Sequence, residues 1–173
     1  LHIEYPVNHT ANRILKPVNE SRTVRHLLRI GAIANGMAIE LQRRVDFPMI
    51  DLAQVVYYPE YFDLAHRFFE ESWEKICDIA YPVITQQMHL GFPAVHTSSD
   101  YLAPLRYGDI VHCKLWIESV GSSSIVWKYE FRNQDEFLCW TARVVTVCVD
   151  MQTFEKRDVP DEIADALRKC TED

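Results

Sequence analysis

The chain has 173 residues, of which 48% are hydrophobic and 25% are charged, and its formal net charge is −7. This length is sufficient for one domain with its own hydrophobic core, and the composition is that of a globular protein. No apolar run approaches the roughly 18 residues of a membrane span, and the negative charge argues against nucleic acid as the main partner.

Residues 1–38 differ in charge from the rest of the chain. They carry a net charge of +3, which leaves −10 on residues 39–173. They show no clear hydrophobic period and no signal-peptide core, because Arg29 interrupts their main apolar run. We therefore expect an N-terminal extension over residues 1–38, with a targeting segment, a packed arm and sequence upstream of a start at Met37 all left open. The folded domain is expected over residues 39–173.

The first predicted elements are a strand and a long helix. Alternating side chains over residues 39–47 predict the strand, and Pro48 ends it. Pro59 suits the first turn of a helix, where its missing N–H costs nothing. The helix is expected to run to about Ile79. Apolar residues recur along it at helical spacing, at Tyr61, Leu64, Ala65, Phe68, Phe69, Trp73 and Ile76.

The second half of the domain is rich in strand signals. Residues 82–93 are expected to form a loop with a short turn. Four strands are then predicted over about 94–103, 109–120, 123–133 and 137–150, and a short closing helix over 160–170. One long helix followed by antiparallel strands indicates an α+β domain of two layers.

The cysteines and histidines argue against a disulfide framework or a metal site. The five cysteines are odd in number and include no Cys-x-x-Cys pair, which favours buried free thiols in a reducing compartment and hence a cytoplasmic protein. The histidines lack ligand spacing, so no metal and no bound cofactor is expected. The Gly-x-Ser-x-Gly and Gly-x-x-x-x-Gly-Lys motifs are both absent.

The most informative stretch runs from Asp46 to Tyr61. It places Asp51 between the first strand and the start of the long helix. A carboxylate there can act as a base or nucleophile, while free N–H groups of the helix hold a developing oxyanion. The alternative is that Asp51 only caps its own turn, a position that Asp favours.

The chain contains two motifs, one at residues 51–61 and one at residues 104–109. Together they resemble the 4-hydroxybenzoyl-CoA thioesterase family of hotdog-fold enzymes and its acyl-CoA thioesterase relatives. The family pattern Asp-x-Asp-x-x-Gly-Val-Val-Tyr-(His/Tyr)-x-x-Tyr matches Asp51, the run 55–58 and Tyr61. The family's Pro-(Leu/Ile)-Arg-x-Gly-Asp turn matches residues 104–109. The resemblance covers about residues 39–159.

The chain departs from the family pattern at three places. Met49 stands where the family has its first Asp, and Gln54 stands where it has a helix-side Gly. Gly121-Ser122 replaces a basic pair that some hydroxybenzoyl enzymes carry. The first two departures concern substrate fit and the approach to Asp51, and the third concerns how the nucleotide of CoA is bound.

The resemblance implies a hotdog fold, in which a long central helix is wrapped by a five-stranded, mostly antiparallel sheet. It also implies a homodimer with a continuous sheet and two sites at the interface, with dimers that often pair into tetramers. The substrate would be an acyl-CoA. An aromatic acyl group is suggested by Tyr57, Tyr58 and Tyr61, although these rings could equally belong to the core.

The resemblance also implies residue roles. Asp51 would attack the thioester or activate a water, and the backbone N–H of Tyr58 would polarise its carbonyl. Each remaining candidate has a plain structural alternative as an ordinary polar or core residue. These substrate-binding candidates are Gln54, Tyr57, Tyr61, Thr97, Ser98, Ser99, Arg106 for the CoA phosphates, and Ser124 near the thioester.

Two other functions compete with an acyl-CoA thioesterase. A thioesterase acting on acyl carrier protein would need a basic patch near the pocket, which the acidic domain does not suggest. A non-catalytic hotdog module that binds acyl-CoA is favoured by Met49 and Gln54 and disfavoured by Asp51. Hotdog hydratase activity is not expected, because no Asp here is followed five residues later by His.

Overall fold

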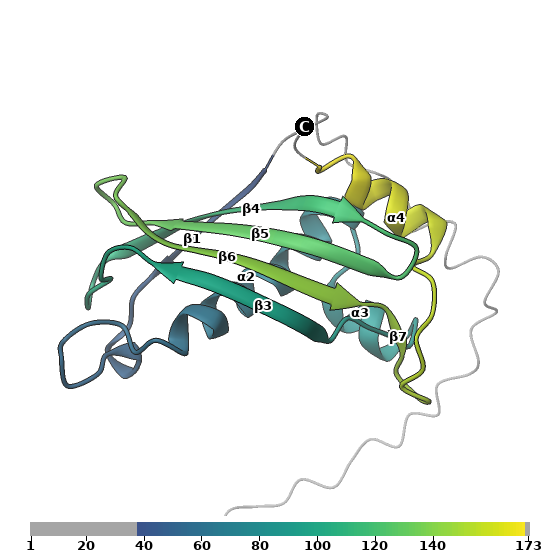
Figure 1. Cartoon of the computed structure of the whole chain (residues 1–173), viewed down its shortest axis with the longest axis horizontal. Helices are drawn as coiled ribbons and strands as arrows, with labels where there is room; N and C mark the ends of the chain where they lie inside the picture. Colours follow the sequence, from purple (N-terminus) through teal and green to yellow (C-terminus); the bar gives the residue numbers. More distant parts are fainter. Residues whose placement is uncertain (1–37, 172–173) are drawn as a thin grey trace, which may run out of the picture.

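The computed structural model describes residues 38–171, and the N-terminal extension expected over residues 1–38 falls, but for its last residue, outside them (Figure 1). In chain order the elements are β1 (Ile39–Arg44), the 3-10 turn η1 (Phe47–Met49), α2 (Glu60–Cys77), α3 (Tyr81–Gln86), β2 (Leu90–Gly91), β3 (Ala94–Tyr101), β4 (Ile110–Val120), β5 (Ser124–Arg132), β6 (Leu138–Val147), β7 (Val149–Asp150) and α4 (Asp161–Arg168).

The main sheet has five strands in the order β1-β4-β5-β6-β3, and every neighbouring pair is antiparallel. The long helix α2 lies across one face of this sheet, as Figure 1 shows. This is the hotdog arrangement that the family resemblance implies, within the two-layer α+β class that the sequence pattern predicts. Its edge strands are β1 and β3, and β3 is exposed along almost its whole length.

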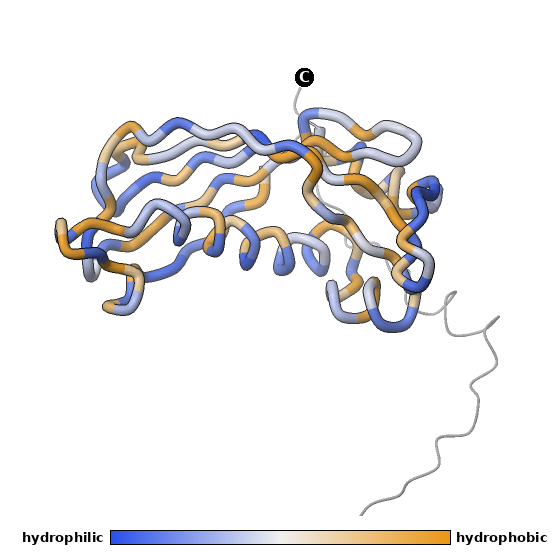
Figure 2. Tube along the Cα trace, turned by 60° about the horizontal axis from the view of Figure 1, so that its bottom comes forward, coloured by the Kyte–Doolittle hydropathy of each residue, from blue (hydrophilic) through white to orange (hydrophobic). Residues whose placement is uncertain are grey.

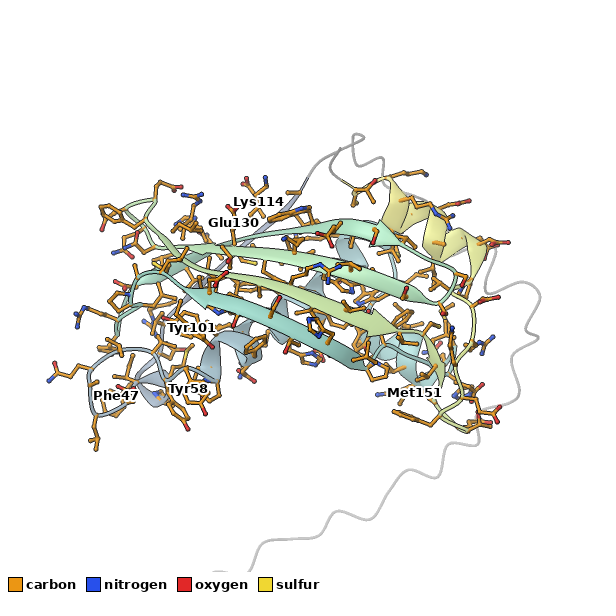
Figure 3. All side chains as sticks on the ribbon, in the orientation of Figure 1. Phe47, Tyr58, Tyr101, Lys114, Glu130 and Met151 are labelled. Atoms are coloured by element: carbon orange, nitrogen blue, oxygen red, sulfur yellow. The ribbon has the colours of Figure 1, made fainter. Side chains whose placement is uncertain are left out.

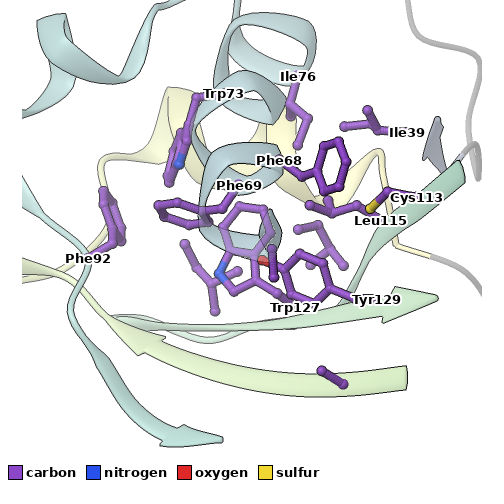
Figure 4. Close-up of a cluster of buried hydrophobic side chains, with 14 of the residues drawn as sticks. Ile39, Phe68, Phe69, Trp73, Ile76, Phe92, Cys113, Leu115, Trp127 and Tyr129 are labelled. Atoms are coloured by element: carbon purple, nitrogen blue, oxygen red, sulfur yellow. The ribbon is translucent and has the colours of Figure 1, made fainter. Parts of the chain in front are cut away.

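The core lies between α2 and the sheet. One side of α2 is buried, and its side chains pack against β4 and β5; Figure 4 shows this cluster, in which Phe68, Trp73 and Trp127 are fully buried. Hydrophobic and hydrophilic residues alternate along α2 and the strands in Figure 2. The periods seen in the sequence thus place one face of each element in the core.

Two segments differ from the expected elements. Residues 82–93 are not only a loop, because α3 begins at Tyr81 and β2 occupies Leu90–Gly91. The strand expected over 137–150 is broken at Cys148, where the chain leaves the main sheet so that β7 can pair with β2. Both segments are short and lack a long hydrophobic period, and tertiary contacts define them.

All five cysteines are buried free thiols, as the sequence predicts. Burial raises the pKa of Cys77 to about 12 and that of Cys148 to about 11. Thiols held in the protonated form are poor nucleophiles. In the described part of the chain, no helix combines the length and hydropathy needed to cross a membrane.

Candidate active site

Asp51 lies in a tight turn between β1 and α2. Its carboxylate oxygen Oδ1 accepts hydrogen bonds from the N–H groups of Ala53 at 2.8 Å and Val55 at 3.5 Å. Its backbone N–H donates to the carbonyl of Val55 at 3.0 Å. The side chain is partly buried, and within residues 38–171 its Oδ2 accepts no hydrogen bond. Asp51 therefore caps its own turn with one oxygen and keeps the other available.

Gln54, at the position where the family pattern has glycine, has a left-handed backbone. Its φ is 63°, in the left-handed region that non-glycine residues rarely occupy. The Gln54 N–H donates to the carbonyl of Asp51 at 3.0 Å, which closes the turn. The turn thus forms without glycine, and the departure at this position alters the side chain and leaves the local fold intact.

The two motifs found in the sequence contact each other in space. The N–H of Val56 donates to the carbonyl of Leu105 at 2.9 Å, and the N–H of Leu105 donates to the hydroxyl of Tyr61 at 3.2 Å. The Arg106 guanidinium reaches the carbonyl of Gln54 at 3.5 Å. The Asp51 turn is therefore held against the turn that follows β3.

The start of α2 offers free backbone donors beside this turn. Within the described residues, the N–H of Tyr58 has no hydrogen-bond acceptor, and the helix is capped by no side chain at Pro59. The positive end of the helix dipole favours negative charge here. The hydroxyl of Tyr101, at the end of β3, donates to the carbonyl of Tyr58 at 3.1 Å and anchors the next peptide unit, between Tyr58 and Pro59.

Aromatic and aliphatic side chains are exposed around the turn. Tyr57 and Tyr58 stack edge to face and are 47% and 63% exposed, so they are not core residues. Tyr61 is buried, and burial raises the pKa of its hydroxyl. Other exposed apolar residues at this end are Phe47, Leu52, Leu102 and Tyr107. An apolar surface of this kind is typical of an interface or a ligand site.

The remaining candidates lie elsewhere on the chain. Thr97 and Ser98 are exposed in the middle of β3, and Ser99 beside them is partly buried. Ser124 opens β5 at the end of the sheet opposite to the Asp51 turn, so one chain does not bring Ser124 and Asp51 together. Arg106 is exposed and, among the described residues, forms no ion pair with a carboxylate.

An apolar groove of about 450 Å³ lies between α2 and the β3 edge of the sheet. Ligand pockets typically measure about 300–1,000 Å³, so this groove has a suitable size. The groove starts at Phe62, within the first turn of α2, and ends at Met151 and Phe154. Figure 3 places Met151 at the end of the molecule opposite to Phe47 and Tyr58. Six of its sixteen lining residues are Phe or Tyr, namely Phe62, Phe69, Tyr81, Phe92, Tyr129 and Phe154.

Sequence reasoning assigned no role to Tyr101 or to the end of the groove. Tyr101 lies three residues before the second motif, and no sequence pattern predicted its contact with Tyr58. Met151 and Phe154 belong to no sequence motif. They reach the groove because they follow β7, and the sequence does not show that β7 is separate from β6. No group of three or more potential metal ligands occurs within residues 38–171.

Residues 45–167 match the family model of the thioesterase-like superfamily. A 1,4-dihydroxy-2-naphthoyl-CoA hydrolase of Prochlorococcus marinus (strain NATL1A) is 31% identical over 122 residues, which are 67% of this chain and 81% of that protein. An enzyme of the same name from Nostoc punctiforme is 30% identical over 133 residues, 76% of this chain and 87% of that protein.

Solved structures share the fold. A 1,4-dihydroxy-2-naphthoyl-CoA thioesterase from Synechocystis superposes with a TM-score of 0.68 at 24% identity, covering 75% of this chain and 95% of that one. A thioesterase superfamily protein from Jannaschia sp. CCS1 superposes with a TM-score of 0.74 at 17% identity, covering 92% and 100%. These likenesses place the described domain in the hotdog fold.

Proposed function

The chain belongs to the thioesterase-like superfamily, and from this membership we propose that it hydrolyses an aromatic acyl-CoA to the free acid and CoA, with Asp51 as the catalytic carboxylate. The observation that carries the proposal is the Asp51 turn, which keeps one carboxylate oxygen free beside the open N-terminus of α2. The relatives that act on dihydroxynaphthoyl-CoA support the same class of reaction.

The chemistry needs one negative and one positive group around the thioester carbonyl. Asp51 Oδ2 attacks the carbonyl carbon or removes a proton from an attacking water. The N–H of Tyr58 receives the negative charge that develops on the carbonyl oxygen, aided by the helix dipole. If Asp51 acts as the base, the C–S bond breaks as the proton taken from water passes from Asp51 to the sulfur, which gives the free acid and the CoA thiol. If Asp51 is the nucleophile, the C–S bond breaks to give CoA thiolate and an acyl anhydride on Asp51; water then hydrolyses the anhydride to the free acid and the Asp51 carboxylate, and the proton released neutralises the thiolate.

The complete site is proposed to form between two copies of the chain. The exposed edge of β3 presents unpaired backbone groups, which is a template for pairing with another strand. Antiparallel pairing of two β3 strands about their middle, near Thr97 and Ser98, brings Tyr101 of one copy beside Ala94 of the other. The partner's Tyr58 and Asp51 then face the groove of this chain, as the resemblance implies.

The groove favours an aromatic acyl group. Flat rings pack well on the aromatic faces of Phe62, Phe69 and Phe92, where edge and face contacts add to the burial of apolar area. The substrates named for the relatives carry a fused two-ring acyl group, so 1,4-dihydroxy-2-naphthoyl-CoA and 4-hydroxybenzoyl-CoA are the first substrates to test.

The catalytic assignment is tested by Asp51→Asn. The amide oxygen still accepts the N–H of Ala53, so the turn and the fold survive, but the negative charge is lost. We expect kcat to fall by at least about a hundredfold, the lower end for general acid–base catalysis. CoA release is followed with a thiol reagent on aromatic, short-chain and long-chain acyl-CoAs. Asp165→Asn, on the distant helix α4, serves as the matched control.

The outcomes separate the competing functions. Turnover that is lost in Asp51→Asn and kept in Asp165→Asn supports the proposal, and unchanged turnover in Asp51→Asn refutes the assignment of Asp51. If the wild-type protein cleaves acyl carrier protein thioesters but no acyl-CoA, the partner is the carrier protein. If it binds acyl-CoA without cleaving it, the chain is a binding module.

The assembly is tested by Ser98→Lys. In the proposed pair of β3 strands, Ser98 lies opposite the partner's Thr97 at the centre of the contact, so Ser98→Lys places one charged side chain on each strand beside the symmetry axis. Lysine on an edge strand disfavours edge-to-edge pairing. We expect wild-type protein to sediment as a dimer of twice 20.2 kDa or a multiple of it, and Ser98→Lys to sediment as a monomer. Ser122→Lys, on the exposed β4–β5 hairpin, is the control. A dimer that persists in Ser98→Lys excludes pairing through β3.

A further inference from the structure

The hydroxyl of Tyr101 joins two segments that lie 43 residues apart in the chain. Tyr101 is the last residue of β3, and its hydroxyl donates to the carbonyl of Tyr58, in the segment that leads into α2. Both residues lie at the same end of the molecule in Figure 3. The proposed reaction uses the backbone N–H of Tyr58 and gives Tyr101 no part. A bond from the sheet to the residue that carries the oxyanion donor is a candidate for positioning that donor.

Tyr101 is held in the fold through its backbone and through its ring. Its backbone pairs with β6, and the next two N–H groups, of Leu102 and Ala103, donate to the carbonyl of Cys139 at 2.8 and 3.1 Å. Its ring packs edge to face on the ring of Tyr61, with the two centroids 5.2 Å apart. Tyr61 is buried, so the contact ties the Tyr101 ring to the core. The hydroxyl is therefore carried by a fixed support.

The two peptide units that meet at the Tyr58 Cα are each held by one hydrogen bond. The first unit contains the Tyr57 carbonyl and the Tyr58 N–H, and this carbonyl accepts the N–H of Glu60 at 2.9 Å. In a planar trans peptide the carbonyl and the N–H point in opposite directions, so the Tyr58 N–H points away from Glu60 and out of the helix start. The second unit contains the Tyr58 carbonyl and the nitrogen of Pro59, and Tyr101 holds it.

The second peptide unit depends on Tyr101 for its orientation. Pro59 has no N–H, so this unit cannot donate a hydrogen bond. Among the described residues, no backbone N–H donates to the Tyr58 carbonyl. The proline disfavours helical backbone at Tyr58 and leaves a broad extended range, within which the Tyr101 hydroxyl selects one orientation. Rotation of this unit would move the Tyr58 N–H relative to α2.

On the basis of the proposed function, we propose that Tyr101 is a positioning residue, whose hydroxyl holds the Tyr58–Pro59 peptide so that the Tyr58 N–H meets the carbonyl oxygen of the thioester. In this role Tyr101 acts through the backbone and transfers no proton. A donor that is already in place needs no reorganisation while negative charge develops on the oxygen. Misplacing the Tyr58 N–H therefore weakens binding of the transition state more than binding of the substrate.

The test is Tyr101→Phe, which removes the hydroxyl and keeps the ring that packs on Tyr61. On the aromatic acyl-CoA that the wild type hydrolyses best, we expect kcat to fall about tenfold, equivalent to about 1.4 kcal/mol, and KM to stay within about twofold. The acid side of the pH–rate profile should keep its midpoint, because the Asp51 turn is unchanged. Tyr107→Phe is the control. It removes another exposed tyrosine hydroxyl, at the variable position of the second motif, and should keep kcat within about twofold.

Two further measurements separate positioning from a structural role. Tyr101→Phe should sediment as the wild type does, because the ring and the β3 backbone remain. Its melting temperature should fall by no more than about 4 °C, the shift expected for the loss of one exposed hydrogen bond. A lower melting temperature with unchanged kcat would show that the hydroxyl has a structural role only, and positioning would be refuted.

Turnover by the wild type distinguishes this inference from the proposed function. If the wild type hydrolyses acyl-CoA and Tyr101→Phe keeps kcat within about twofold, positioning is refuted and the thioesterase stands. A raised KM with unchanged kcat would assign the hydroxyl to substrate binding and would equally refute positioning. If the wild type hydrolyses no acyl-CoA, the proposed function fails, and the positioning role fails with it.

Discussion

Residue-scale features near Asp51 show how a motif can be kept while its most constrained position changes. Gln54 stands where the family pattern has glycine; it takes the left-handed conformation, and its N–H closes the turn on the Asp51 carbonyl. Backbone hydrogen bonds within the turn offset the cost of this conformation. The sequence alone could not decide between this outcome and a different turn, because both are compatible with glutamine.

Gln54→Gly is expected to stabilise the protein. Left-handed backbone costs roughly 1–2 kcal/mol for a residue with a Cβ, and the greater freedom of unfolded glycine offsets about 0.5–1 kcal/mol of the gain. The free energy of unfolding should therefore rise by up to about 1.5 kcal/mol in urea titrations. Gln42→Gly, in strand β1, should lower it. A lower free energy of unfolding in Gln54→Gly would show that the backbone of Gln54 is not strained.

The burial of Cys77 predicts how the stability of the fold falls at alkaline pH. Burial raises the pKa of Cys77 in the folded state to about 12, above the ordinary value of 9.0 in the unfolded chain. The folded state therefore holds more protons between these values, and stability is full below pH 9 and falls as the pH rises toward 12. Each such proton contributes about 1.4 kcal/mol per pH unit.

The measurement is urea unfolding at pH 8 and pH 10.5 for wild type and Cys77→Ala. Wild type should lose more stability between these pH values than Cys77→Ala does, because the variant lacks the linked proton. Equal losses in the two proteins would show that another group governs alkaline unfolding.

At the scale of elements, hydrophobic period accounts for what the sequence could predict. The long stripe from Tyr61 to Ile76 predicted α2, and alternation predicted the five main strands, with errors of a few residues at their ends. The short elements α3, β2 and β7 were missed, because few residues carry their pattern and long-range pairing defines them. The groove end was missed with them, since β7 positions Met151 and Phe154.

The candidate site was likewise predicted only in part from the sequence. Both motifs were found in the sequence, and their mutual contact through Val56 and Leu105 follows from the fold. The hydrogen bond from Tyr101 to the Tyr58 carbonyl required three dimensions, because 43 residues separate its ends. A pattern of residue types predicts which groups are present, whereas the distances between elements come only with the packed structure.

At the scale of the whole molecule, the Asp51 turn and the end of the groove lie at opposite ends of one chain. In the proposed dimer each site takes Asp51 from one copy and the groove from the other. Two different inactive variants should then restore activity when they are mixed. Asp51→Asn removes the carboxylate, and Thr85→Trp fills the groove from α3.

Refolding the two variants together in equal amounts should produce half of the dimers as mixed pairs, each with one intact site. About a quarter of the wild-type activity should return, by the statistics of random pairing of a two-fold dimer. Each variant refolded alone is the control. Mixtures that stay inactive while mixed dimers form would place the whole site within one chain.

The left-handed backbone of Phe154 also bears on how this protein can change over time. Substitutions that reshape a binding site commonly reduce stability, so new specificities draw on a limited reserve. At Phe154 the relation is reversed for glycine, because glycine has no Cβ to strain the left-handed backbone. Phe154→Gly therefore changes the lining of the groove without this cost in stability, and the position offers a starting point for directed evolution.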